Sequence, residues 1–320
     1  MSRIVVTGKI PAGGLARLKA EHDVDAWEQD GPISRGELLT KVKGADAIVS
    51  LLTEKIDDEL LDAAGAQLKS VSNVAVGYNN IDVPACQKRG VIVTNTPGVL
   101  TEATADIAMS LILMVTRRLG EGERVIRANQ PWQWGMFYML GAGIQGRQLG
   151  IVGMGQIGIA TARRAKAFGM NIAYTRRTPL AGHIVEELEA KYMSMDELIE
   201  SSDVLSLHCP YSPATHHLIA ENQLARMKPT AYLINTARGP IVNEQHLVDA
   251  LKAGKLAGAG LDVFENEPAV NPGLLDLENV VLLPHLGSAT VETRAAMADM
   301  AATNALAILA GKTAPNQVTA

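Results

Sequence analysis

Three side chains suited to proton transfer and anion binding stand in separate stretches of the second half of the chain: Arg238 in INTARGPIV, Glu267 in GLDVFENEP and His285 in VVLLPHLGSAT. An imidazolium can give up a proton near neutral pH. A carboxylate bonded to its other ring nitrogen orients the ring and stabilises its charge. A guanidinium can hold a carboxylate and polarise a carbonyl oxygen. Taken singly, the three could also be structural, as a salt-bridge partner, a solvated loop acid and a structural histidine.

A glycine-rich loop precedes all three. Gly153, Gly155 and Gly158 have the spacing G-x-G-x-x-G, with Gln156 and Ile157 between the last two. The loop follows an apolar strand-like run and opens a helical pattern, which is the context that a dinucleotide site requires. The glycines allow a tight turn and close approach of a pyrophosphate, and the helix N-terminus supplies amides and a positive dipole. A tight turn without a ligand is the alternative interpretation.

The end of the second strand of this unit carries positive charge. An NAD-specific site places Asp or Glu there to bind the adenosine ribose, whereas this chain has Thr175, Arg176 and Arg177 after Tyr174. A carboxylate would repel a 2′-phosphate, and guanidinium groups would bind it. The pattern therefore predicts NADP(H) as the preferred cofactor, with NAD(H) possible. Alternatively, both arginines face solvent beside a neutral NAD pocket.

The elements that must position these residues follow from the apolar pattern. Short runs rich in Val, Ile and Leu alternate with helical patterns, which is typical of parallel strands covered by helices on both faces. We expect an α/β fold of two doubly wound, Rossmann-like parallel-sheet domains with a cleft between them. The first set of strands, up to about Pro97, has four candidates, and the second set begins at Gln148.

Two long helices are expected to join these sets. One spans the pattern of residues 101–126, and the other runs from about residue 288 to Gly311 and packs back on the first set. The predicted domains are then a discontinuous substrate-binding domain of residues 1–98 plus 290–320, and a dinucleotide-binding domain of residues 99–289. Each catalytic candidate follows a strand of the second domain, so all three fall near the carboxyl edge of its sheet.

Composition excludes several classes of function. The 320 residues carry a formal net charge of −5, so neither nucleic acid nor an anionic membrane is an expected partner. Two cysteines, Cys86 and Cys209, provide neither a disulfide framework nor a zinc site. The longest apolar run is too short to span a bilayer, and the first residues do not resemble a signal peptide. We expect a cytoplasmic protein without a bound metal.

The glycine loop, the Arg, Glu and His stretches, VAVGYNNID and TEATAD together resemble the D-isomer-specific 2-hydroxyacid dehydrogenase family, and within it most closely the glyoxylate/hydroxypyruvate reductases. The resemblance implies NADPH-dependent reduction of small 2-keto acids by hydride transfer. His285 would be the general acid, Glu267 would orient it, and Arg238 would hold the substrate's carboxylate and carbonyl oxygen. The resemblance also implies a homodimer.

Further contacts are carried over from the family pattern. Backbone amides at Val76 and Gly77 would bind the substrate, and Ser288 would face the substrate or the nicotinamide. Trp134 would reach the neighbouring subunit's active site, although it could instead simply bury area at a dimer interface. Gly135 and Met136 depart from the Pro and Lys that often follow this tryptophan. The remaining expected cofactor contacts are Thr104, Cys209, Pro210, Thr236, Ala237, Asp262 and Gly287. His208 is either a structural histidine or a further residue lining the cofactor pocket.

Other functions remain open on the same scaffold. The substrate can be a bulkier 2-keto acid, such as phenylpyruvate or 2-ketogluconate. A different class is an NAD(H)-sensing corepressor, which keeps the same triad but binds peptides. The arginine pair disfavours that sensor, because sensors of this kind prefer NAD(H). Formate dehydrogenase is disfavoured because it pairs its histidine with Gln, and phosphoglycerate dehydrogenase because it usually adds a regulatory domain.

Overall fold

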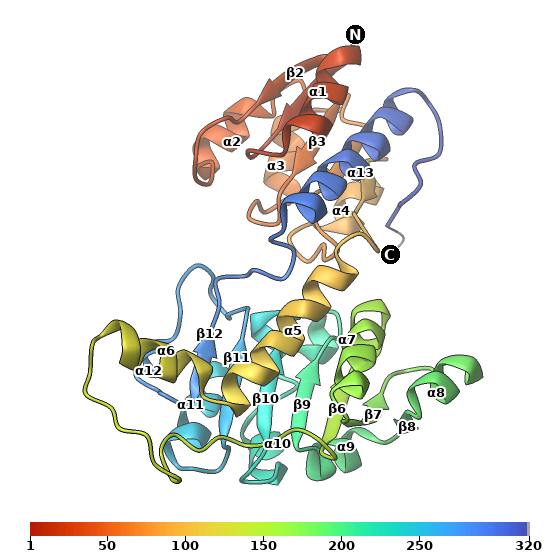
Figure 1. Cartoon of the computed structure of the whole chain (residues 1–320). Helices are drawn as coiled ribbons and strands as arrows, with labels where there is room; N and C mark the ends of the chain where they lie inside the picture. Colours follow the sequence, from red (N-terminus) through yellow and green to blue (C-terminus); the bar gives the residue numbers. More distant parts are fainter. Residues whose placement is uncertain (319–320) are drawn as a thin grey trace. The chain divides into compact units, whose positions relative to one another are not determined.

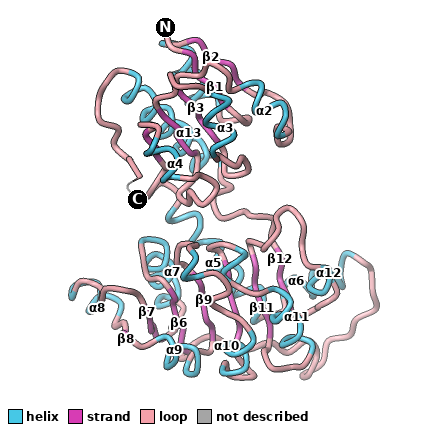
Figure 2. Tube along the Cα trace, turned by 180° about the vertical axis from the view of Figure 1, so that it is seen from behind, coloured by secondary structure: helices cyan, strands magenta, loops and turns pink. Residues whose placement is uncertain are grey.

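The computed structural model describes residues 1–318, and the chain divides into two compact units (Figures 1 and 2). The first unit comprises Met1–Leu100 and the chain from Ser288 on, and the second is Thr101–Gly287. The sequence predicts these divisions at residues 98/99 and 289/290. Each unit is built on a parallel sheet with helices packed against it, which confirms the predicted α/β class.

The first unit has a five-stranded parallel sheet in the order β2-β1-β3-β4-β5. Its strands are β1 (Arg3–Val6), β2 (Asp23–Ala26), β3 (Ala47–Ser50), β4 (Ser70–Asn73) and β5 (Ile92–Thr94). Its helices are α1 (Ala12–Glu21), α2 (Arg35–Lys41), α3 (Asp58–Ala64), α4 (Val83–Lys88) and α13 (Val291–Leu309). As expected, α13 packs on this sheet, against β3 and β4, and it also lies along α1.

The sequence predicts four strands in this unit, one fewer than the structure has. The strand with the weakest sequence signal is β2, whose sequence DVDA contains two aspartates. It lies at the edge of the sheet and pairs with β1 alone, so none of its residues is fully buried. An edge strand of this kind lacks the continuous apolar run by which a central parallel strand is recognised.

The second unit has a seven-stranded parallel sheet in the order β12-β11-β10-β9-β6-β7-β8. Its strands are β6 (Gln148–Val152), β7 (Asn171–Thr175), β8 (Lys191–Tyr192), β9 (Val204–Leu207), β10 (Tyr232–Asn235), β11 (Gly258–Leu261) and β12 (Val280–Leu282). Its helices are α5 (Thr101–Thr116), α6 (Leu119–Arg127), α7 (Gln156–Ala167), α8 (Gly182–Leu188), α9 (Met195–Ser201), α10 (Glu221–Arg226), α11 (Glu244–Lys252) and α12 (Pro272–Leu275). The chain order reverses beside β6, which has β7 on one side and β9 on the other. Such a switch point is where open α/β sheets bind ligands.

The predicted single helix over residues 101–126 is wrong, because the structure breaks it after Thr116. Arg118 takes a left-handed conformation with φ +56°, and α6 starts at Leu119. The Thr116 carbonyl accepts a hydrogen bond from Ala142 N at 2.7 Å, so it is not used to continue α5. The break directs α6 and the following segment away from the line of α5 (Figure 1).

Membrane-spanning helices and metal sites each have requirements that the described residues do not meet. Within residues 1–318, no helix has both the length and the apolar character needed to cross a membrane. In the same range, no group of His, Cys, Asp or Glu side chains is arranged to hold a metal ion.

Candidate active site

The catalytic candidates of the second unit follow neighbouring strands. Arg238 comes after β10, Asp262 directly after β11, and His285 after β12. The strands are parallel and in register, with Asn235 opposite Leu261 and Leu261 opposite Leu282. Parallel strands end at one edge of the sheet, so the structure brings these stretches together as the sequence predicts.

His285 and Glu267 form a hydrogen-bonded pair. His285 Nδ1 lies 2.7 Å from Glu267 Oε2, and the two side chains are 27% and 31% exposed. Glu267 Oε1 accepts a hydrogen bond from Phe264 N at 2.9 Å, which fixes the carboxylate on its other side. The pair uses Nδ1 of the imidazole and leaves Nε2 as the nitrogen that can face a substrate.

Electrostatics keep Glu267 ionised. Burial acts to raise the pKa of its carboxyl group, but the hydrogen bond and charge of His285, the Phe264 N–H and the charge of Arg238 outweigh burial and lower that pKa. A carboxylate that stays charged stabilises the imidazolium beside it. The arrangement therefore suits a histidine that must hold a proton until it is transferred.

Arg238 is held by the turn that follows β10. The Asn235 side chain donates from Nδ2 to the Arg238 carbonyl at 2.9 Å and accepts from Ala237 N at 3.0 Å. Burial lowers the pKa of Arg238, and the charge of Glu267 acts in the opposite direction. A Cβ on Gly239 would lie 1.8 Å from the Phe264 carbonyl carbon, so glycine lets this turn pack on the segment that carries Glu267.

Asp262 holds the turn around His285. Its carboxylate oxygens accept hydrogen bonds from Leu286 N at 2.6 Å and Gly287 N at 2.8 Å, and its carbonyl accepts one from His285 N. Burial raises the pKa of Asp262, and these N–H groups and the His285 charge only partly offset that effect. The sequence predicts Asp262 only as a cofactor contact and gives no sign that it supports the His285 turn.

Thr104 also reaches the same turn. Its hydroxyl donates to the Gly287 carbonyl at 3.0 Å, which ties the start of α5 to the chain after β12. The sequence predicts Thr104 and Gly287 as separate cofactor contacts. The structure shows that they bind each other.

The glycine loop has the space that a phosphate group needs. Gly153 has φ +85°, and a Cβ there would lie 2.5 Å from Cys209 N and Cα. Gly155 is the N-cap of α7, and a Cβ on it would meet nothing within 4 Å. The first turn of α7, from Gln156 on, contains no acidic residue, and no side chain caps it. The helix N-terminus is thus open toward an anion.

Buried polar groups nearby fit the same interpretation. Thr236 Oγ1 is buried without a hydrogen-bond partner in the described part of the chain, so it offers a polar contact to a bound group. Cys209 and Pro210 follow β9, and burial raises the pKa of the Cys209 thiol to about 11. His208 is bonded to Ser206 at 2.8 Å, and burial lowers the pKa of His208 to about 4. Cys209 and His208 therefore present neutral groups beside the glycine loop.

The two arginines differ in their surroundings. Thr175 is the last residue of β7, one residue beyond the predicted end, and its carbonyl accepts from Gly153 N at 3.0 Å. Arg176 Nη1 donates to the Met154 carbonyl at 3.1 Å, which places this guanidinium against the glycine loop. Arg177 is exposed. Both lie where the sequence predicts the adenosine ribose.

Other predicted contacts lie in other parts of the structure. Val76, Gly77 and Ser288 belong to the first unit, with Val76 and Gly77 in the loop after β4. Trp134 is 75% exposed in the segment after α6. His217, which is not among the predicted contacts, is bonded through Nε2 to Glu265 at 2.5 Å.

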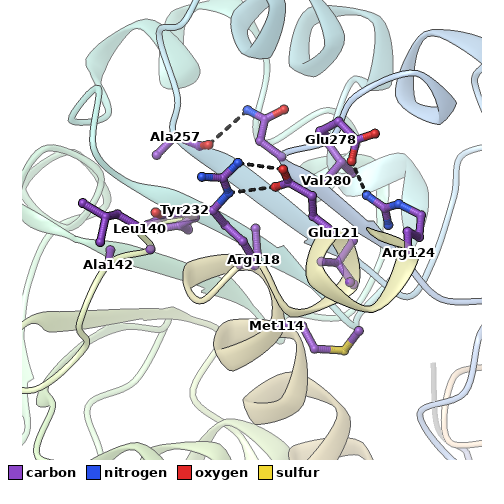
Figure 3. Close-up of a pocket in the computed structure, with 15 residues that line it drawn as sticks. Met114, Arg118, Glu121, Arg124, Leu140, Ala142, Tyr232, Ala257, Glu278 and Val280 are labelled. Carbon is purple, nitrogen blue, oxygen red and sulfur yellow. Dashed lines mark hydrogen bonds and ion pairs between the residues drawn. The ribbon is translucent and has the colours of Figure 1, made fainter. Parts of the chain in front are cut away.

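A cavity of about 410 Å³ lies at the amino ends of strands β10 and β12 of the second sheet (Figure 3). It is lined by Tyr232 and Val280, which begin β10 and β12, and by ion pairs of Arg118 with Glu121 and of Arg124 with Glu278. The catalytic candidates follow the carboxyl ends of these strands. The cavity at the amino ends is therefore separate from the candidate site.

Comparisons with known proteins identify the family. Residues 109–287 match the family described as D-isomer specific 2-hydroxyacid dehydrogenase, NAD binding domain. The chain is 48% identical to a glyoxylate reductase of Korarchaeum cryptofilum, over 99% of this chain and 95% of that protein. The structure is similar to that of the TT0316 protein from Thermus thermophilus, with a TM-score of 0.92, 42% identity and coverage of 99% and 100%.

A third similarity concerns a structure with a bound cofactor. It is the NADPH-dependent glyoxylate/hydroxypyruvate reductase from Sinorhizobium meliloti in complex with NADP and malonate, with a TM-score of 0.87, 37% identity and coverage of 99% of this chain and 97% of that one. The family domain matches, and the Korarchaeum cryptofilum relative is 48% identical over nearly the whole length. The chain therefore belongs to the D-isomer specific 2-hydroxyacid dehydrogenase family and is an NAD(P)-dependent oxidoreductase.

Proposed function

We propose that this enzyme reduces small 2-keto acids, glyoxylate and hydroxypyruvate, to 2-hydroxy acids and prefers NADPH. The observation that carries the proposal is the His285–Glu267 pair, which lies with Arg238 at the edge of the sheet that bears the glycine loop. The names of relatives, glyoxylate reductase and glyoxylate/hydroxypyruvate reductase, agree with this substrate class.

His285 is the general acid in this proposal. When bound, the reduced nicotinamide supplies the hydride that adds to the carbonyl carbon. The protonated imidazole gives its Nε2 proton to the carbonyl oxygen, which becomes the hydroxyl group. Glu267 remains ionised, and its hydrogen bond to Nδ1 of His285 holds the ring in place. His285 therefore ends the step neutral and regains a proton from solvent.

Arg238 binds the other end of the reacting group. Its guanidinium holds the substrate carboxylate and polarises the carbonyl oxygen, where negative charge develops. Backbone amides at Val76 and Gly77 complete the carboxylate site, and Ser288 faces the substrate or the nicotinamide. The first unit thus acts as the substrate-binding domain, and the second as the dinucleotide-binding domain.

The residues around the glycine loop would hold the cofactor. The open helix N-terminus at Gly155, Gln156 and Ile157 suits the pyrophosphate, and the unpartnered Thr236 hydroxyl suits a polar group of the dinucleotide. Ala237, Asp262, Cys209 and Pro210 complete the expected contacts. Thr175, Arg176 and Arg177, with no acid among them, suit a 2′-phosphate.

The cofactor preference is tested by Arg176→Glu combined with Arg177→Ala. We expect this double variant to lose far more kcat/KM with NADPH than with NADH, because it removes both cations and introduces a repelling carboxylate. Arg163→Ala, which removes an arginine paired with Glu187 on the same unit, is the control. It should change kcat/KM with neither NADPH nor NADH. Equal losses with the two cofactors would remove the assignment of these arginines.

We also propose a homodimer formed through the segment that follows α6. Large apolar side chains are exposed there in succession, namely Trp132, Trp134, Met136, Phe137, Tyr138 and Leu140. An exposed patch of this kind on a monomer marks an interaction site. Trp134 would then reach the partner's active site and favour small polar substrates.

The experiment that tests the function is a set of initial rates with glyoxylate and hydroxypyruvate, each with NADPH and NADH, followed by nicotinamide absorbance. Fast NADPH-selective turnover supports the proposal. Turnover with NADH alone keeps the reaction and overturns the cofactor preference. Turnover only with phenylpyruvate or 2-ketogluconate moves the assignment to a bulkier substrate, and no turnover with any keto acid favours an NAD(H)-sensing binding protein.

A further inference from the structure

The loop after β4 has all its central carbonyl groups occupied. The carbonyls of Ala75, Val76 and Gly77 accept hydrogen bonds, in that order, from Thr96 N, Asn95 Nδ2 and Asn73 Nδ2, at 2.9, 2.8 and 2.9 Å. Two of these three donors are asparagine side chains, which no sequence motif singles out. Three amide donors therefore fix the carbonyl groups of this loop.

This arrangement determines where the amide N–H groups point. In a planar trans peptide, the carbonyl of one residue and the N–H of the next point in opposite directions. Thr96 therefore sets the direction of the Val76 N–H, and Asn95 sets that of the Gly77 N–H. Within residues 1–318, neither of these two N–H groups donates to a protein acceptor, so both are available to an anion.

Asn95 is itself fixed at both backbone groups. Its N–H donates to the Asn316 carbonyl at 3.2 Å, and its carbonyl accepts from Asn304 Nδ2 at 3.1 Å. Asn304 is fully buried on α13, and its Oδ1 accepts from Asn316 Nδ2 at 3.2 Å. The C-terminal helix therefore holds the residue that orients the Val76–Gly77 peptide.

Asn73 is oriented from the opposite side. Ser50 Oγ donates to Asn73 Oδ1 at 3.0 Å, and this leaves Nδ2 of Asn73 facing the Gly77 carbonyl. Asn73 and Ser50 are both fully buried at the ends of adjacent strands. The Asn73 amide cannot turn over without losing its buried hydrogen bond with Ser50.

We infer that Asn95, supported by Asn304, is a positioning residue for the substrate carboxylate. It does not contact the substrate; it turns the Val76–Gly77 peptide so that the Gly77 N–H faces the carboxylate and the Val76 carbonyl faces away. The inference rests on the proposed function, in which these two amides bind the carboxylate. Without the Asn95 side chain the peptide can rotate and present a repelling oxygen instead of a donor.

Two variants of Asn95 test this role. Asn95→Ala removes the donor, and Asn95→Asp keeps the size of the side chain but replaces the donating NH₂ with an oxygen. A hydrogen bond to a charged group corresponds to about a tenfold change in affinity or more. We expect each variant to raise KM for glyoxylate about tenfold, with little change in kcat and none in KM for NADPH.

The matched control is Asn171→Ala. Asn171 also donates from Nδ2 to a backbone carbonyl, that of Gly146 at 2.9 Å, but it lies in the second unit at the start of β7. Its loss should leave both KM values unchanged. Thermal unfolding of the three variants shows whether any effect on KM follows merely from lower stability.

Oxalate binding separates this inference from the proposed reaction. Oxalate, a small carboxylate that accepts no hydride, is titrated calorimetrically into the enzyme with saturating NADPH. We expect about tenfold weaker binding in the Asn95 variants than in Asn171→Ala. Unchanged oxalate binding, or an equal loss of oxalate and NADPH, overturns the positioning role. A wild-type enzyme that binds oxalate but does not reduce glyoxylate overturns only the reaction, and one that binds no oxalate overturns both.

Discussion

At the level of single residues, the candidate site depends on one carboxylate with several partners. Glu267 bonds His285 through one oxygen and Phe264 N through the other, and the charge of Arg238 acts on it as well. These contacts together lower its pKa despite burial. The same carboxylate thus orients the proposed acid and compensates the charge of the proposed anion-binding arginine.

Replacing Glu267→Gln tests the pair. The variant keeps the size of the side chain and the contact with His285 but loses the charge that stabilises the imidazolium. We expect kcat for glyoxylate reduction to fall while KM for NADPH stays unchanged. His285→Gln should lose about 10²–10⁴-fold in kcat, the range for a positioned proton donor.

A control variant and a stability measurement complete this test of Glu267. Glu200→Gln removes an ion-paired carboxylate on α9 and should leave kcat unchanged. Because the folded-state pKa of Glu267 is lowered, its stabilisation is present above the ordinary value, near pH 4.3, and disappears as the pH falls through the lowered value. Urea unfolding at about pH 7 and about pH 3 should show a smaller difference between Glu267→Gln and the wild type in acid. An unchanged kcat in Glu267→Gln would contradict the role of Glu267.

At the level of elements, two glycines of the glycine loop have different roles: Gly153 is needed for folding, and Gly155 for binding of the cofactor. A methyl group at Gly153 meets the backbone of Cys209 and requires an L residue at φ +85°, whereas one at Gly155 meets only open space. We expect Gly153→Ala to lower Tm by several degrees. Gly155→Ala should retain the wild-type Tm and lose NADPH binding about tenfold or more, because the methyl group occupies the space for the phosphate.

Thermal unfolding with and without NADPH measures both effects. The wild type should gain stability from saturating cofactor, and Gly155→Ala should gain little. Gly182→Ala, at the start of α8 where a Cβ also meets nothing, is the matched control and should bind NADPH as the wild type does. Normal NADPH binding by Gly155→Ala would rule out the proposed phosphate position.

The same elements show what the sequence can predict. Buried parallel strands and the glycine loop are predictable, because a continuous apolar run that ends in a glycine triplet and opens a helical pattern is typical of the first strand of a dinucleotide-binding unit. The edge strand β2 and the short β8 are not, since neither has a buried run. The break at Arg118 escapes prediction because the Thr116 carbonyl is taken by Ala142, a residue far along the chain.

The candidate site shows the same limit. Arg238, Glu267 and His285 are found because their types and order suggest chemistry. The Asp262 bonds to Leu286 N and Gly287 N are not, since a buried aspartate has no sequence signature that names its donors. The asparagines behind the Val76–Gly77 loop are missed for the same reason: Asn95 and Asn304 are 209 residues apart. Such support depends on the tertiary fold.

At the level of the whole molecule, the segment after α6 exposes large apolar side chains that a single chain leaves in contact with water. Phe137 is 89% exposed, and Trp134 and Met136 are nearly as open. None of the residues of α6 is buried within the second unit. Large aromatic and methionine side chains are enriched in protein interfaces, where their burial contributes strongly to association.

The double variant Met136→Asp with Phe137→Asp tests the dimer. Two buried charges without partners would oppose association, so we expect sedimentation velocity to show a dimer for the wild type and a monomer for the variant. Leu275→Asp, which places a charge at an exposed leucine of α12, is the control and should remain dimeric. If Trp134 acts across the interface, the monomer should also lose activity with glyoxylate while it still binds NADPH. A dimer that survives the double variant would place the interface elsewhere, and a wild-type monomer would leave Trp134 without a partner site to enter.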